Sequence, residues 1–556
     1  MRKFLLLILS AICIFSLIMF TACGGTSDNE YDGVVIELED ALAYVEVGST
    51  FKINYAVTNA EGKTASWKSL DNSICTVESG IVSGLKEGTT KVTISVGGVK
   101  AECEIIVFTY QEETADPITD TFEVYSDYID GELFGNDLII DLKTYGLTYF
   151  KNAKAKLTNG NLTKDIAIRP SSNKEKIFIS GTEFGASLYG DNVKLILSTG
   201  DKRVTIPFTN VVTKYIKSAS DVENLFFYGN LDLVSGFYTY DGYFVQTQTI
   251  DLDFVPLNYR THTEAGGGIY YLDDPVYIDP NFGEGKICTG AVASGFLYSW
   301  FNVDVGFLGT YDGQGNSILN FSMLNNNNHL PQAAQGNRGG IFGNISRKGV
   351  VKNLGVTGGA NWGWFSYTRN TLLATSINGT LENVYTKVKA EARPIGAGQD
   401  RDTATSAVNT LAYCISGATL KNVVAEYDAT AIEHVYKETH NDLWIFALVG
   451  PENQYVDGKS ILNGDKVDPS KITADSVIIW ENSSYDINVY ENTYFFYTKL
   501  DGVNLRYSSD PTFTNRKNPP FEAYAYGEIP DKEFVLDDWS YWELSEQNYP
   551  VFKGIL

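Results

Sequence analysis

The most constraining feature of this sequence is a short pattern that recurs in its C-terminal half. An apolar residue, a variable residue, an asparagine and a second apolar residue repeat with their asparagines 33, 30 and 39 residues apart. Repeats of about this length indicate stacked structural units, because one unit alone is too small to bury its apolar face. The four copies are Ile318–Phe321, Val351–Leu354, Leu381–Val384 and Leu420–Val423.

The repeated asparagines, Asn320, Asn353, Asn383 and Asn422, favour a solenoid with a structural ladder of amides. An asparagine fixed beside aliphatic residues can hold the local turn and stack on the asparagine of the next coil. Buried polar groups then remain paired. We therefore expect Asn353 and Asn383 to point inward and to bond to backbone groups at a turn.

Several elements around these asparagines carry a resemblance to a known family. They are Gly309–Ile318 (GTYDGQGNSI), Gly340–Gly343 (GIFG), Trp542 and Tyr549–Phe552 (YPVF). The first two resemble the opening elements of the GLUG-type repeats of bacterial surface proteins, and the last two resemble their closing coil. The resemblance spans residues 215–556, is close from 309 to 358 and is slight from 440 to 535. It implies a right-handed parallel β-helix on the cell surface, usually without an assigned activity.

Composition supports strands elsewhere in the chain. The 35 Tyr, 30 Phe and 51 Gly residues, against 3 Met and 4 His, favour strands and turns over helices. Short alternating runs separated by glycine turns predict two β-sandwiches, at residues 34–109 and 118–213. An acidic linker from Gln111 to Pro117 is expected between them. A capping box at Ser220–Glu223 predicts one short helix.

Four motifs in the first predicted sandwich carry a second resemblance. They are Val47–Thr50 (VGST), Trp67–Asp71 (WKSLD), Gly80–Gly84 (GIVSG) and Glu87–Ile94 (EGTTKVTI). Residues 34–108 resemble the group 2 bacterial immunoglobulin-like domain, which implies a spacer or adhesion module with no catalytic residues to carry over. The predicted fold class is therefore all-β: an immunoglobulin-like sandwich, a second β-sandwich and a C-terminal parallel β-helix.

The N-terminus has the pattern of an export signal. A basic start and an apolar run from Phe4 to Phe20 precede Cys23. The junction resembles a lipobox, although Phe20 stands where an aliphatic residue is usual. The resemblance implies a signal peptide at 1–22, a lipid on Cys23 that attaches the protein to the membrane, and a tether at 23–33. The alternatives, an uncleaved membrane anchor and ordinary secretion, also export the chain.

Two cysteines fall within the first predicted sandwich. Cys75 and Cys103 lie in expected strands, and outside the cell such a pair can oxidise to a disulfide. The alternative is two buried thiols that act as small hydrophobes. Cys288 and Cys414 are far apart in the sequence and form no motif.

Candidates for catalysis and metal binding are few. Asp251 and Asp253, on one face of an expected strand, would be about 7 Å apart, a separation that suits inverting glycoside hydrolysis or a calcium site. His434, Glu438 and His440 would share one strand face and could bind zinc. Asp251, however, lies in an element that the non-enzymatic repeats also carry, and plain solvated residues explain the His434, Glu438 and His440 set. We therefore expect no catalytic residue, no metal site and no cofactor.

The remaining candidate is an aromatic platform. Trp362 and Trp364 flank a glycine and have Tyr367 close by, so they could stack on a sugar ring or simply cover the core. The net charge of -25 excludes nucleic acid as a partner. The sequence predicts a lipid-anchored surface protein that binds a glycan or a neighbouring cell-surface protein. The alternatives are a polysaccharide lyase or hydrolase and a purely structural surface component.

Overall fold

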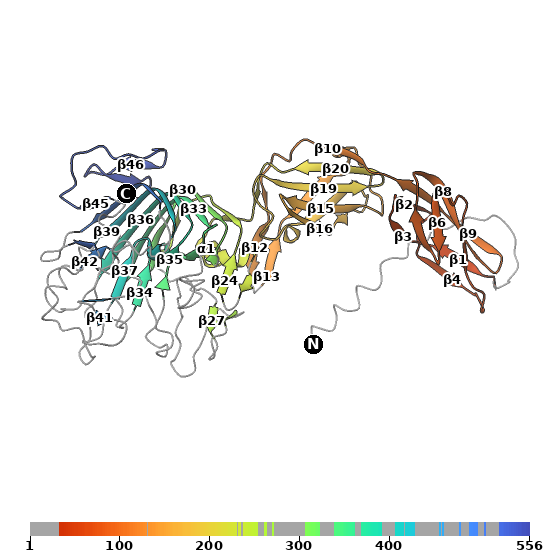
Figure 1. Cartoon of the computed structure of the whole chain (residues 1–556), viewed down its shortest axis with the longest axis horizontal. Helices are drawn as coiled ribbons and strands as arrows, with labels where there is room; N and C mark the ends of the chain where they lie inside the picture. The colour runs from red at the N-terminus through yellow and green to blue at the C-terminus, as the bar shows by residue number, and fades with distance from the viewer. Residues whose placement is uncertain are drawn as a thin grey trace. The chain divides into compact units, whose positions relative to one another are not determined.

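A computed structural model of the whole chain shows the predicted all-β class (Figure 1). Within the residues that it describes, no helix is long and apolar enough to cross a membrane. The described residues are 33–129, 132–230, 232–234, 237–253, 261–263, 269–271, 306–322, 338–361, 368–391, 406–415, 417–428, 455–456, 459–460, 477–479, 489–498, 505–507 and 522–555.

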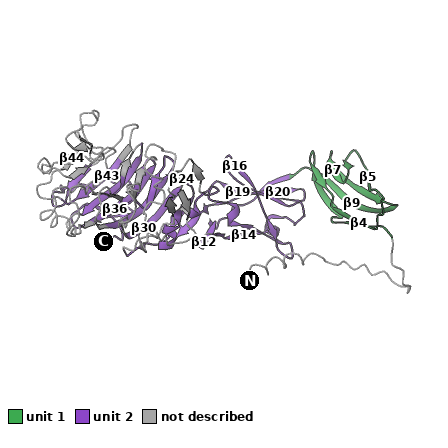
Figure 2. Ribbon diagram, turned by 90° about the horizontal axis from the view of Figure 1, so that it is seen from below, with its two compact units in different colours: residues 1–110 green, residues 111–556 purple. Residues whose placement is uncertain are grey.

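The chain divides into two compact units, residues 1–110 and 111–556 (Figure 2). The first unit contains β1 (Val35–Leu38), β2 (Leu42–Glu46), β3 (Thr50–Lys52), β4 (Tyr55–Thr58), β5 (Ser66–Ser69), β6 (Cys75–Glu78), β7 (Ile81–Gly84), β8 (Gly88–Val96) and β9 (Val99–Phe108). One sheet has the order β2-β9-β8-β5, a second has β3-β7-β6, and β1 pairs with β4. Buried and exposed residues alternate along β8 because successive side chains point to opposite faces of a strand.

Cys75 and Cys103 lie in different sheets of this sandwich, on β6 and β9. Both are buried free thiols in the structure, which is the arrangement of the second alternative. Each packs as a small hydrophobe into the aliphatic core. Cys75 Sγ lies 3.5 Å from Ser69 Oγ, and Cys103 Sγ lies 3.6 Å from the carbonyl oxygen of Glu104. These local contacts satisfy both thiols without a bond between them.

The second unit begins with a second sandwich. Its sheets have the orders β10-β20-β19-β15-β16 and β14-β18-β17, with the pairs β11-β21 and β12-β13. The elements are β10 (Gln111–Thr114), β11 (Phe122–Glu123), β12 (Tyr125–Ile129), β13 (Glu132–Gly135), β14 (Asp137–Asp141), η1 (Leu142–Tyr145), β15 (Lys154–Asn159), β16 (Leu162–Ile166), β17 (Arg169–Pro170), β18 (Lys176–Ser180), η2 (Gly181–Glu183), β19 (Val193–Thr199), β20 (Lys202–Pro207) and β21 (Val211–Val212).

The sequence predicts an acidic linker from Gln111 to Pro117, and for the first four of these residues the prediction is wrong. Gln111–Thr114 form the edge strand β10, which pairs in parallel with β20. All four residues of β10 are exposed, and Glu112 Oε1 accepts a hydrogen bond of 2.7 Å from Arg203 Nη1. Charged, solvated side chains are common on edge strands because they discourage further pairing.

A parallel β-helix follows the second sandwich, as the sequence predicts. Its elements are β22 (Lys214–Ile216), α1 (Ala219–Glu223), α2 (Leu225–Tyr228), β23 (Asp232–Val234), β24 (Phe237–Tyr240), β25 (Tyr243–Gln246), β26 (Ile250–Asp251), β27 (Thr261–Thr263), β28 (Ile269–Tyr271), β29 (Gly306–Phe307), β30 (Thr310–Ser322), β31 (Arg338–Gly339), β32 (Phe342–Ile345), β33 (Val350–Asn361), β34 (Thr368–Thr371), β35 (Ala374–Ile377), β36 (Thr380–Glu391), β37 (Ser406–Asn409), β38 (Ala412–Ile415), β39 (Thr419–Asp428), β40 (Tyr455–Val456), β41 (Lys459–Ser460), β42 (Val477–Ile479), β43 (Val489–Tyr497), β44 (Leu505–Tyr507), β45 (Glu522–Ala525), β46 (Trp542–Leu544) and β47 (Pro550–Phe552).

Three columns of strands build the coils of the β-helix (Figure 1). The long column runs β22-β25-β30-β33-β36-β39-β43-β45, and every neighbouring pair in it is parallel. The second column contains β24-β29-β32-β35-β38, and the third contains β31-β34-β37. The short helix α1 is capped by Ser218 rather than Ser220, because the Ser218 hydroxyl accepts the backbone N–H of Asp221.

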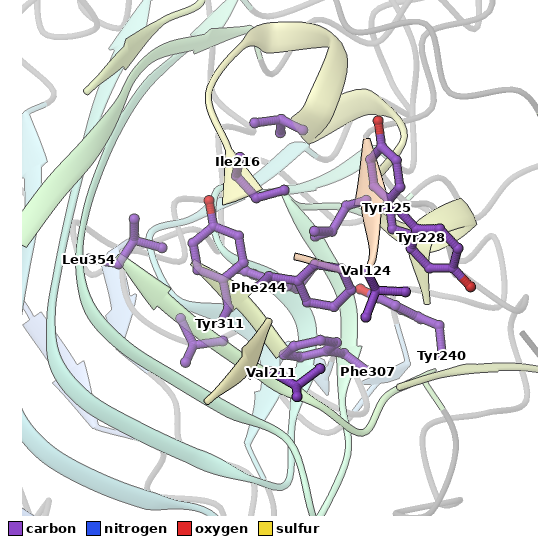
Figure 3. Packing of buried hydrophobic residues seen from close by; sticks show 14 of the residues in the cluster. Val124, Tyr125, Val211, Ile216, Tyr228, Tyr240, Phe244, Phe307, Tyr311 and Leu354 are labelled. Atoms are coloured by element: carbon purple, nitrogen blue, oxygen red, sulfur yellow. The ribbon is translucent and has the colours of Figure 1, made fainter. Parts of the chain in front are cut away.

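One apolar core runs through both parts of the second unit. Val124 and Val211 of the second sandwich belong to the same cluster as Phe244, Phe307 and Leu354 of the β-helix (Figure 3). The second sandwich therefore shares its core with the β-helix. The first unit does have clusters of its own.

A buried lysine lies where these two parts meet. The Lys214 side chain is 5% exposed, and its Nζ lies 3.6 Å from Glu123 Oε1 and 3.7 Å from Asp221 Oδ1. The same Nζ donates to the carbonyl oxygen of Ser126 and lies 5.3 Å from the centroid of the Tyr228 ring. A desolvated ammonium of this kind requires nearby compensating groups. Lys214 therefore ties the second sandwich to the first strands of the β-helix.

The C-terminal residues 526–555, which we call the cover, do not form the closing coil expected from the sequence. Trp542 and Phe552 lie on the antiparallel pair β46-β47, which pairs with no other described strand. Both pack with Tyr385 and Val424, whereas the adjacent Val384 belongs to the inner core. Neighbouring strand residues face opposite sides of a sheet. The cover therefore lies on the outer face of the long column.

Candidate functional site

Asparagines of successive coils form a ladder along the long column. Asn383 Nδ2 donates to Asn353 Oδ1, Asn422 Nδ2 donates to Asn383 Oδ1, and Asn492 Nδ2 donates to Asn422 Oδ1, each at 3.0 Å. These four residues have φ values from 48° to 54°. Asparagine adopts this left-handed conformation more readily than most residues. The same residue type therefore provides both the bend in the strand and the bond to the next coil.

The ladder differs from the sequence prediction in its partners. Asn383 and Asn422 are buried, with 6% and 2% exposure, and their side chains bond to one another. Asn422 Oδ1 also accepts the backbone N–H of Asp537, which comes from a distant segment and not from a local turn. Asn353 is half-buried. Each amide points its N–H group toward the preceding coil, so the chain of bonds needs an acceptor at its end. Asp312 provides that acceptor, 3.0 Å from Asn353 Nδ2.

Two residues of the ladder also differ from those that the sequence predicts. Asn320 lies outside it and donates to Asp251 Oδ1 at 2.8 Å, because Ile318 of its repeat pairs with Val356 rather than with Val351. Asn492 belongs to the ladder but was missed. Its neighbours are tyrosine, glutamate and threonine, so the pattern of flanking aliphatic residues does not identify it.

A row of alternating charges runs beside the ladder. The register of β30, β33, β36, β39 and β43 aligns Asp312, Lys352, Glu382, Lys421 and Glu491. Lys352 Nζ lies 3.3 Å from Asp312 Oδ2, and Lys421 Nζ lies 3.3 Å from Glu491 Oε2. A hydrogen bond to Glu491 raises the pKa of Lys421. The variable position of the repeat, which changes from Lys to Glu to Lys, was the sequence signal for this row.

A buried carboxylate lies beneath the cover. The Glu426 side chain has no exposed surface, and its Oε2 lies 3.3 Å from Lys387 Nζ. Tyr385 donates to Oε1 at 2.5 Å, while Tyr526 and Tyr549 of the cover donate to Oε2 at 2.7 and 3.3 Å. Burial is the main cause that raises the pKa of each tyrosine, so all three remain donors at neutral pH. This cluster fastens the cover to β36 and β39.

The candidate catalytic pair is not arranged for glycoside hydrolysis. Strand β26 ends at Asp251, and Asp253 lies in a turn with φ 48°, so the two residues do not share a strand face. Asp251 Oδ1 accepts the backbone N–H of Asp253 and the amide of Asn320, both at 2.8 Å. The first of these bonds is the main cause that lowers the pKa of Asp251. A general acid requires a raised pKa instead.

Several sequence candidates lie outside the described residues. They are Cys23, Cys288, the platform Trp362, Trp364 and Tyr367, and the zinc candidates His434, Glu438 and His440. Within the described part of the chain, no group of three or more His, Cys, Asp or Glu side chains is placed to hold a metal ion.

The fold defines a modular all-β protein in which a β-sandwich unit precedes a second sandwich fused to a parallel β-helix. No protein-family model and no curated protein matches this chain. Domains 1–6 of the surface layer protein SbsC match over 30% of this chain and 23% of their own length, with 14% identity and a TM-score of 0.13.

Two further solved structures are similar over part of the chain. Domains 5–6 of SbsC match over 32% of this chain and 98% of that one, at 15% identity and a TM-score of 0.12. An endo-fucoidan hydrolase of glycoside hydrolase family 107 matches over 34% and 30%, at 14% identity and a TM-score of 0.12. Likeness at this level assigns neither an activity nor a partner to this chain.

Proposed function

We propose that this chain is a lipid-anchored bacterial surface protein that binds carbohydrate in adhesion and does not catalyse a reaction. The observation that carries the proposal is the use of carboxylates in the β-helix. Asp251, Asp312 and Glu426 each accept hydrogen bonds that join neighbouring coils or hold the cover. A glycoside hydrolase instead needs two carboxylates that flank a bond of its substrate.

The N-terminal residues support the surface location. The apolar run before Cys23 and the polar residues after it resemble a lipoprotein signal. Two acyl chains hold a protein at a membrane more firmly than one, at about 0.8 kcal/mol for each buried methylene group. The immunoglobulin-like sandwich and the second sandwich would then act as spacers between the membrane and the β-helix.

Retention on immobilised polysaccharides tests the binding role. Purified residues 24–556 should be retained on at least one neutral polysaccharide and should elute with the same polysaccharide in solution. If the protein binds no carbohydrate but binds a protein from neighbouring cells, the proposed partner is a protein and the carbohydrate-binding role is contradicted.

The anchor has its own test. Cys23→Ala should release the protein into the medium or leave its precursor uncut. Processed protein that remains in the membrane after this change would contradict lipidation at Cys23. The other two export routes would then be distinguished by the mass of the mature N-terminus.

A further inference from the structure

The cover presents one large aromatic side chain at its surface. Trp539 is 37% exposed, whereas Trp542 in the same segment is 2% exposed. Trp542 packs edge-on against Phe552, with ring centroids 5.3 Å apart, and so completes the apolar cluster beneath the cover. Trp539 is not a member of that cluster. Packing of the cover therefore explains Trp542 but does not explain the position of Trp539.

The loop that carries Trp539 is held on both sides. Before it, the backbone N–H of Asp537 donates to Asn422 Oδ1, and Asp537 Oδ1 accepts from Asn492 Nδ2, both at 3.1 Å. After it, the backbone N–H of Trp542 donates to the carbonyl oxygen of Trp539 at 3.1 Å. The asparagine ladder thus fixes one end of the loop. A binding side chain on a rigid support loses little conformational entropy when a ligand arrives.

A charged acceptor precedes the exposed ring. Asp538 Oδ1 accepts the backbone N–H of Ser540 at 2.8 Å and its hydroxyl at 2.5 Å. Asp538 Oδ2 receives no hydrogen bond from the part of the chain that the structure describes, and Asp538 is exposed. The carboxylate therefore has a fixed orientation and an oxygen that can accept a ligand hydroxyl.

We infer that Trp539 and Asp538 form a subsite for one pyranose ring of a neutral polysaccharide. This inference rests on the carbohydrate-binding function proposed above and locates it. The C–H groups on one face of a pyranose can pack on the indole ring, while hydroxyls at the ring edge can donate to Asp538. One cation lies at this loop, because Lys553 Nζ donates to the carbonyl oxygens of Trp539 and Ser540 at 3.4 and 2.7 Å. The two neighbouring carboxylates, Asp537 and Asp538, outnumber it, and with the chain's net charge of -25 they disfavour anionic sugars.

Affinity electrophoresis of residues 24–556 tests the subsite. The probes are dextran, starch and galactomannan as neutral polysaccharides, with polygalacturonate as the anionic comparison. Trp539→Ala should weaken binding to the retained neutral polysaccharide about tenfold. Trp539→Tyr should keep most of the affinity because it keeps a stacking ring. Leu544→Ala is the matched control, since it removes another exposed apolar side chain from the same segment.

Each outcome separates this inference from the function on which it rests. Loss of affinity in Trp539→Ala but not in Leu544→Ala, with unchanged melting temperatures, supports the subsite. Carbohydrate binding that Trp539→Ala leaves unchanged would overturn the subsite but not the proposed function. Absence of binding to all neutral probes would overturn both. Preferential binding of polygalacturonate would contradict the neutral ligand.

Discussion

Asn383 and Asn353 lie 30 residues apart in the chain, and the amide of the first donates to the side-chain oxygen of the second at 3.0 Å. Both residues have a left-handed backbone, and both mark the same place in consecutive coils. A single residue type therefore bends the strand and fixes its register against the next coil. Substitution of Asn383 by alanine or by glycine separates these two roles.

Asn383→Ala should destabilise the second unit. It leaves the partner groups on Asn353 and Asn422 unpaired, at a cost of about 1 to 3 kcal/mol, and places alanine in a left-handed conformation at about 1 kcal/mol more. Asn383→Gly should show only the cost of the unpaired amide groups, because glycine adopts the left-handed conformation freely. Urea unfolding measures both. A variant as stable as the wild type would refute the structural role of the ladder.

An exposed asparagine provides the control for backbone strain. Asn548 has φ 64° and is exposed, with no ladder partner among the described residues. Asn548→Ala should therefore show only the smaller backbone cost. If Asn548→Ala and Asn383→Ala destabilise equally, the amide bonds between coils contribute nothing measurable.

Lys214→Ala should destabilise the second sandwich and the β-helix together. The change leaves Glu123 and Asp221 without their buried cation, which costs about 3 to 5 kcal/mol in comparable pairs. Calorimetry should show one lowered transition for the second unit and an unchanged transition for the first. Lys91→Ala, which breaks the exposed pair with Glu102, is the control and should change little. Separate melting of the second sandwich would contradict a shared core.

Glu426→Ala should loosen the cover without unfolding the coils. The hydroxyls of Tyr385, Tyr526 and Tyr549 would lose their common acceptor, at a cost of about 1 to 3 kcal/mol for each buried hydroxyl left unpaired. Limited trypsin digestion should then cut at Lys532 faster than in the wild type. Glu543→Ala removes an exposed carboxylate from the same segment and should leave the rate unchanged. Equal rates in all three proteins would refute the role of Glu426.

The stability of the first unit should depend on alkaline pH through Cys103. Burial is the main cause that raises the pKa of this thiol from 9.0 to about 11. Its contribution is complete below pH 9.0 and is lost as the pH rises through about 11, because the unfolded thiol ionises first. Cys103→Ala should therefore lose less stability over this range. Parallel stability curves for the two proteins would contradict the raised pKa.

The repeated asparagines made the β-helix predictable, because apolar-x-Asn-apolar is a local pattern. The pattern predicted Asn320 in the ladder, but Tyr311 pairs with Val351 and Ile318 with Val356, and a regular repeat contains no signal for this offset. Asn492 lacked the aliphatic neighbours that define the pattern. Local sequence thus predicts the coils but not every residue that joins them.

The sequence patterns do not predict contacts between residues that lie far apart in the chain. The cover crosses coils far from it in the chain, as the Tyr549 to Glu426 bond shows, so no local pattern predicts where it packs. The same limit applies to Trp539. An exposed and a buried tryptophan in one segment have the same identity in the sequence, and only the packing of Trp542 against Phe552 distinguishes them.

Product analysis of the bound polysaccharide tests the central claim most directly. Residues 24–556 are incubated with the neutral polysaccharide that retains them, and the length distribution and reducing ends of that polysaccharide are measured over time. The account predicts that the polysaccharide remains bound and keeps its original length, since Asp251, Asp312 and Glu426 accept hydrogen bonds that join coils or hold the cover. Shortened chains, new reducing ends or unsaturated products would show catalysis and contradict it.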